Sequence, residues 1–204
     1  MILPSFVCAV RTGNSEPAIL RSYDTDEVEL LYDECKIWEA CRATSAATTF
    51  FDPIKIGPFD QEFADGAIIY NNPIQLVHQE AKSLWPGEDF LLVSIGTGSA
   101  PGGSFAGNIK NIIEAMKSIV TQTERTANDF FLSHQDMVEK QTLFRFNVYH
   151  GLAGVGLEEW KEKAKMADAT QVYLMNSEIR QKVRGCITSL SRLETPGRMV
   201  TSQP

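Results

Sequence analysis

The run DFLLVSIGTG, residues 89–98, limits the possible folds of this chain more than any other stretch. It is a continuous apolar segment that ends in a glycine-rich turn, a pattern typical of a strand buried on both faces of a parallel sheet. Parallel strands need crossover connections, usually helices. Segments with strand and helix patterns alternate along the rest of the chain, without an internal repeat. We therefore expect an α/β fold with a mainly parallel sheet.

Upstream of this run, the sequence predicts two short strands at 4–10 and 18–23, separated by loop-forming residues. A helix is predicted within 33–51, with an inward face formed by Ile37, Ala40, Cys41 and Ala43. A brief strand then ends at Asp65. Pro73 suits the first turn of a helix that continues over 74–85.

Downstream, a helical stripe runs from Ile109 to Val120, and a second helical stretch carries Phe130, Phe131, Met137 and Val138. A strand is predicted at 142–149. The segment 157–190 predicts two amphipathic helices, interrupted near residues 166–169, whose apolar sides face the core. We expect residues 191–204 to form a disordered tail, and residues 1–190 to form one domain.

Charge and cysteine usage exclude several classes of partner. The net charge of −7 repels nucleic acid. The four cysteines have no C-x-x-C spacing and no histidine cluster beside them, so we predict free thiols, no metal site and no cofactor. The sequence contains no 20-residue apolar run, and its first residues lack the basic region of a signal peptide. We therefore expect a cytoplasmic protein.

The segment EFADGAIIYNNP, residues 62–73, contains the strongest candidate for a catalytic group, Asp65. A general base needs an ionised group within hydrogen-bond reach of its nucleophile, preferably part-buried so that its pKa rises. Asp-Gly is also a common turn pair. Because this pair lies between two apolar segments, it is not an exposed hairpin tip, whereas the nearby Asp52 and Asp60 lie beside prolines in predicted loop.

Other motifs are weaker. The turn SIGTG suggests an anion-binding loop, but Pro101 stands where the third glycine of G-x-G-x-x-G would fall. Ser104 lies in G-G-S-F-A-G, one substitution short of the G-x-S-x-G nucleophile motif and separated from the strand. We expect Ser104 to be a loop or helix-cap residue. His78, His134 and His150 have no partner spacing and are predicted to be structural or solvated.

Three segments in order, WEACRATSAATTFF, FADGAIIYNNP and LLVSIGTG, resemble the C-terminal half of a patatin-like phospholipase domain, particularly the fungal type. The resemblance spans roughly residues 3–190. It implies a partial three-layer α/β/α sandwich and a lipid acyl hydrolase, a serine esterase that uses a Ser-Asp dyad. The family's D-G-[AG] motif corresponds to Asp65, Gly66 and Ala67, which makes Asp65 the implied general base. The resemblance also implies a lipid or phospholipid substrate and transient contact with a membrane surface.

The chain departs from the family pattern in two respects. It has neither the G-x-S-x-G motif nor the glycine-rich oxyanion loop, which in the family both precede the matched segment. We therefore expect a C-terminal fragment of the domain, inert and poorly stable by itself. Two alternatives are a non-catalytic remnant or lipid-binding module of the same fold, and an anion-binding domain that uses SIGTG.

Overall fold

The computed structural model describes residues 3–25, 31–47, 50–98, 110–152, 155 and 160–193. Ser104, Ile109 and the predicted tail beyond residue 193 lie outside this part of the chain. Contacts between Cα atoms divide the chain into two units. Unit 1 holds residues 1–73 and 109–123, and unit 2 holds residues 74–108 and 124–204.

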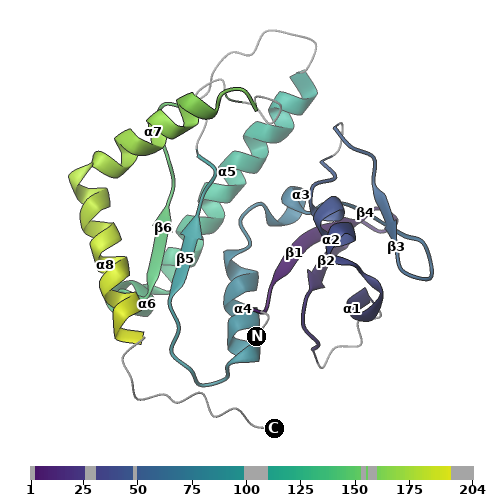
Figure 1. The fold of residues 1–204 in the computed structure, drawn as a ribbon, viewed down its shortest axis with the longest axis horizontal. Helices are drawn as coiled ribbons and strands as arrows, with labels where there is room; N and C mark the ends of the chain where they lie inside the picture. Colours follow the sequence, from purple (N-terminus) through teal and green to yellow (C-terminus); the bar gives the residue numbers. More distant parts are fainter. Residues whose placement is uncertain are drawn as a thin grey trace. The chain divides into compact units, whose positions relative to one another are not determined.

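Unit 1 contains a four-stranded sheet with the order β2-β1-β4-β3 (Figure 1). Its strands are β1 (Phe6–Arg11), β2 (Pro17–Arg21), β3 (Ile54–Ile56) and β4 (Gln61–Asp65). The two predicted strands near the start of the chain are confirmed. They pair antiparallel, with Cys8 opposite Ile19, while β4 pairs antiparallel with both β1 and β3.

The core of unit 1 lies between this sheet and α2 (Ile37–Thr44). Phe63 of β4 and Ala43 of α2 are both fully buried. The predicted inward face of α2 is correct for Ala40 and Ala43 but wrong for Ile37, which is 83% exposed, and for Cys41. The helix contacts the sheet through its smallest side chains, because these allow the two backbones to approach closely. Two further short helices are α1 (Leu31–Glu34) and α3 (Ala67–Tyr70).

Unit 2 contains the parallel pair that the sequence predicts. Strand β5 (Leu92–Ile95) lies parallel to β6 (Leu143–Phe146), with Leu92 opposite Leu143. This pair and the surrounding helices confirm the α/β class. Burial of β5 on both faces is wrong, however, since Ile95 is 79% and Val93 42% exposed. Among the described residues β5 has β6 as its one strand partner, and Val93 and Ile95 lie on its exposed face.

The helices of unit 2 pack around this pair of strands. The predicted helix after Pro73 is α4 (Ile74–Leu84), and the two predicted helical stretches near the middle of the chain are α5 (Lys110–Ser133) and α6 (Gln135–Glu139). The core is formed by one residue from each of five elements: Ile74, Leu92, Phe130, Met137 and Leu143. Helix α5 begins in unit 1 and ends in unit 2, and the side chains of its residues 110–121 are not described.

Two helices, α7 (Lys163–Met175) and α8 (Ser177–Leu193), complete unit 2 (Figure 1). They confirm two helices in this segment, but of the two only α8 is strongly amphipathic, and the break lies at Asn176 and not near residues 166–169. Asn176 ends α7, and its side-chain Oδ1 accepts hydrogen bonds from the backbone N–H groups of Glu178 (2.9 Å) and Ile179 (3.3 Å). Asparagine is a preferred helix N-cap, so this residue starts α8. The predicted burial of the apolar sides is also incomplete, because large apolar side chains of both helices are exposed.

Candidate active site

Asp65 is the last residue of β4, as predicted, and the short helix α3 begins two residues later at Ala67. In the sheet it lies opposite Ala9 of the neighbouring strand β1. Its backbone N–H donates to the carbonyl oxygen of Ala46, 3.0 Å away, just beyond the end of α2. The strand and the end of α2 therefore fix the backbone of this residue. Asp52 and Asp60, by contrast, are exposed in loops.

The Asp65 carboxylate is half-buried, and its two oxygens differ. Oδ1 accepts a hydrogen bond from the backbone N–H of Ala67 at 2.8 Å. None of the described residues donates to Oδ2. Burial raises the pKa of the carboxyl above its ordinary value, and the bond from Ala67 opposes part of that rise. One oxygen thus orients the group, while the other is available to take up a proton at a raised basicity.

Gly66 connects Asp65 to α3 at a point where no side chain fits. A β-carbon at this position would lie 2.5 Å from the carbonyl carbon and oxygen of Cys8 and 2.8 Å from the backbone nitrogen of Ala9. Its φ of −72° is ordinary, so the glycine is required by this close approach and not by backbone conformation. In the D-G-A motif, the backbone at Gly66 therefore packs directly against the backbone of β1.

Asn71 and Asn72 follow α3 and bind one residue of α5. The side-chain Nδ2 of Asn71 donates to the hydroxyl of Thr123, and Nδ2 of Asn72 donates to the Thr123 carbonyl oxygen at 3.3 Å. The two asparagines lie in the turn before Pro73. They also attach this turn to a second element of unit 1.

Two of the three histidines belong to the core of unit 2. The rings of His78 and His134 lie edge to face at 4.7 Å, and His134 stacks on Phe130 at 4.0 Å. Burial lowers the pKa of His78, with a smaller contribution from Lys82. The Ser133 hydroxyl donates to backbone carbonyls of its own helix, and its oxygen also lies 3.0 Å from His134 Nδ1. That nitrogen lies 2.9 Å from the Phe130 carbonyl oxygen as well, so the His134 ring is held against its own helix, whereas His150 is exposed.

Two N–H groups of the SIGTG turn are already bonded within the protein. The N–H of Gly96 donates to the carbonyl oxygen of Phe146, and the N–H of Gly98 donates to the side-chain Oδ1 of Asn147, both at 2.8 Å. Gly98 has φ +98°, which favours glycine. Because both amides already have protein acceptors, they fix the turn onto β6 and do not themselves face an anion.

A buried charge network beside this turn is absent from the sequence predictions. Arg145 of β6 is 7% exposed. Its guanidinium donates to Glu124 Oε1 at 2.6 Å and to the Ser94 hydroxyl at 2.9 Å, and Asn147 Nδ2 donates to the same Glu124 oxygen at 2.9 Å. The network joins α5, β5 and β6. The sequence signal that could have indicated this network is the position of Arg145 between Phe144 and Phe146 in an otherwise apolar strand.

Within the part of the chain that the structure covers, no three His, Cys, Asp or Glu side chains form a group suited to hold a metal ion. The same residues contain no helix long and apolar enough to span a bilayer. The four cysteines are free thiols, and burial raises the pKa of Cys8 to about 11, so this thiol stays protonated at neutral pH.

Comparison with known proteins identifies phospholipases as relatives. The chain is 33% identical over 134 residues to phospholipase A I of Arabidopsis thaliana, covering 61% of this chain and 10% of that protein. It is 30% identical over 118 residues to human calcium-independent phospholipase A2-gamma, covering 55% of this chain and 14% of that protein. The mouse protein of the same name is 31% identical over 118 residues. No protein-family model matches the chain.

Proposed function

We propose that this chain is part of a lipid acyl hydrolase and that Asp65 is its general base. The observation that supports the proposal most directly is the state of the Asp65 carboxylate. It is half-buried at the end of a strand, with Oδ1 held by Ala67 and Oδ2 without a donor among the described residues. Similarity to phospholipases from a plant and from mammals supports the reaction class.

In this proposal Asp65 acts on a serine hydroxyl. Oδ2 accepts the hydroxyl proton while the serine Oγ attacks the carbonyl carbon of a lipid ester, and an acyl-serine forms as the alcohol leaves with a proton from Asp65. Water then attacks the acyl-serine and releases the fatty acid, again with Asp65 as the base. A raised pKa suits both steps, since the same group must take up and return a proton.

The serine and the donors that stabilise the oxyanion are assigned to no residue of these 204, which contain no G-x-S-x-G. The chain spans about a tenth to a seventh of the length of the relatives that it matches. The proposal therefore concerns the natural protein in which this chain occurs, with the nucleophile supplied by a segment outside the sequence shown. The fungal patatin-like type is the form of the family that we propose.

We further propose that hydrolysis requires no calcium. Mammalian relatives are named calcium-independent, and the described residues contain no group of ligands suited to a metal. Calcium prefers six to eight oxygen ligands, so a site would need several carboxylates or carbonyls close together. The substrate that we propose is a phospholipid, met during transient contact with a membrane surface.

The reaction class is tested by incubating the natural protein with a phospholipid dispersion and measuring released fatty acid, in EDTA and in calcium. We expect release at equal rates under both conditions. Release that depends on calcium would contradict the metal-free mechanism. Lipid binding without any release would instead identify a non-catalytic lipid-binding module.

A further inference from the structure

The outer surface of α7 and α8 carries many large apolar side chains. Large side chains are more than two-fifths exposed on both helices and on the residue just before them: Trp160, Val172, Leu174, Met175, Ile187, Leu190 and Leu193. Scattered exposed apolar residues are normal on a protein surface, but contiguous groups mark binding sites. We call residues 160–193 the α7–α8 face.

Two adjoining hollows lie in this face. One, of about 410 Å³, lies between the carboxyl ends of β5 and β6 and the two helices, and its lining includes Phe146, Leu174, Val183 and Ile187. The other, of about 590 Å³, runs along α7 and is lined by Met166, Leu174, Met175 and Arg180, among others. Thr170 and Leu174 line both hollows, so the two adjoin along α7, and we refer to them together as the groove.

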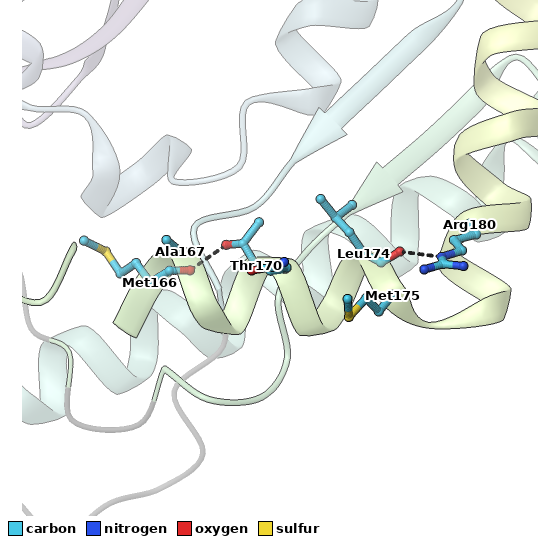
Figure 2. Close-up of a pocket in the computed structure, with 7 residues that line it drawn as sticks. Met166, Ala167, Thr170, Leu174, Met175 and Arg180 are labelled. Atoms are coloured by element: carbon cyan, nitrogen blue, oxygen red, sulfur yellow. Dashed lines mark hydrogen bonds between the residues drawn. The ribbon is translucent and has the colours of Figure 1, made fainter. Parts of the chain in front are cut away.

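The charge of the α7–α8 face is opposite to that of the rest of the chain. Residues 160–193 contain seven lysines and arginines and three acidic residues, a net charge of +4, whereas the whole chain has −7. Arg180, Arg184 and Ile187 recur at helical spacing along α8, so cationic and apolar side chains share one side of the helix. Arg180 lies at the end of the apolar row along α7, where its Nε donates to the Leu174 carbonyl oxygen at 3.4 Å (Figure 2).

We propose that the α7–α8 face docks on an anionic phospholipid surface. Exposed apolar side chains and a tryptophan enter the interface, the groove receives acyl chains, and the arginines lie among acidic head groups. Helix α8 is strongly amphipathic, and amphipathic helices with basic and apolar side chains lie in the plane of a membrane surface. Clusters of four to eight basic residues on a helix are also typical of binding to anionic lipids. A neutral protein partner would not account for the reversal of charge.

This inference rests on the membrane contact in the proposed function and assigns it to one face, and its test is separate because binding needs no catalytic residue. Purified protein is sedimented with vesicles of phosphatidylcholine alone and of phosphatidylcholine with phosphatidylserine. We expect binding to the anionic vesicles that weakens with added salt. The double variant Arg180→Gln/Arg184→Gln should bind about 30-fold more weakly. Each cation near the surface contributes about 1 kcal/mol, and about 1.4 kcal/mol corresponds to a tenfold change in affinity.

Matched variants separate the face from the rest of the molecule. Lys55→Gln/Lys140→Gln removes the same charge from exposed positions elsewhere and should leave binding nearly unchanged. Leu174→Ser/Ile187→Ser should reduce binding at high and low salt alike, whereas Leu132→Ser, a change at a side chain 71% exposed, should not. Circular dichroism confirms that each variant is folded, which is expected because every changed side chain is exposed.

The inference is overturned if anionic vesicles do not bind the protein, or if the two face variants bind as tightly as the unchanged protein. It is also overturned if the groove is occupied by a second copy, seen as a dimer that the Leu174→Ser/Ile187→Ser change dissociates and that vesicles leave intact. An Asp65→Asn protein should bind vesicles normally. Loss of catalysis and loss of docking are thus distinguished.

Discussion

The backbone of Cys8 passes so close to Gly66 that a β-carbon on Gly66 would lie 2.5 Å from the Cys8 carbonyl oxygen. This contact joins the neighbouring strand β1 to the residue that follows the candidate base. It fixes the direction in which the chain leaves β4, and with it the position of Ala67, whose N–H orients the Asp65 carboxylate.

Gly66→Ala should therefore destabilise the fold and displace Asp65. Neither contacting group is a flexible side chain, so the clash is relieved only by moving β1 or β4, at about 1–3 kcal/mol or more. Urea unfolding measures the loss. Gly13→Ala is the matched control, since nothing lies within 4 Å of a β-carbon there, and it should change stability by less than about 1 kcal/mol. Equal effects of the two changes would contradict the role of the contact.

The raised pKa of Asp65 predicts that this residue lowers stability at neutral pH. The folded carboxyl keeps its proton to a higher pH than the unfolded one, so the folded state binds more protons between the two pKa values and stability falls as pH rises through that window. Above it, the ionised group costs stability that a neutral asparagine does not. Asp65→Asn should melt at a higher temperature than the unchanged protein at pH 7.

This difference in melting temperature should vanish below about pH 3, where the Asp65 carboxyl is protonated in both the folded and the unfolded protein. Asparagine retains an oxygen that accepts the hydrogen bond from Ala67, so the turn itself is preserved. A lower melting temperature for Asp65→Asn at pH 7 would show that the ionised carboxylate stabilises the fold. That result would contradict the prediction that burial of this charge lowers stability.

Glu124 should contribute far more to stability than another acid on the same helix. Its partner Arg145 is 7% exposed, so Glu124→Gln leaves a buried charge without its counter-ion, at a cost of about 3–5 kcal/mol. The ion pair of Asp129 with Arg125 has side chains 61% and 82% exposed, and Asp129→Asn should cost about 0–1 kcal/mol. Chemical denaturation of both variants measures the difference. Similar losses would mean that the buried pair contributes no more than an exposed one.

Local patterns were sufficient to predict most of the elements. The strand ending at Asp65, the helix after Pro73 and the parallel strand at residues 92–95 all follow from apolar runs bounded by Gly, Pro or Asn. Patterns of this kind do not report which side of an element is covered. Ile37 and Ile95 are apolar residues at predicted core positions, yet both are exposed, because coverage depends on neighbours distant in the sequence.

The same limit applies to the candidate site. The D-G-A motif identified Asp65, but the approach of Cys8 to Gly66 and the bonds from Asn71 and Asn72 to Thr123 join segments far apart in the sequence. Arg145 and Glu124 are similar, since each is an ordinary charged residue until the fold buries one beside the other. The break between α7 and α8 differs from these features, because it could have been predicted from local sequence. Asn176-Ser177-Glu178 is a helix-start signal, yet the break was predicted near residues 166–169.

The most direct test of Asp65 as the general base is the turnover of Asp65→Asn in the natural protein, measured with a phospholipid and with a soluble ester. Asp60→Asn is the control, because Asp60 is exposed and its φ of +49° is one that asparagine tolerates. We predict that Asp65→Asn lowers kcat by a factor of about 100 or more while remaining folded, as expected for loss of a general base, and that Asp60→Asn retains normal turnover. Near-normal turnover by folded Asp65→Asn would contradict the role of Asp65 in the mechanism.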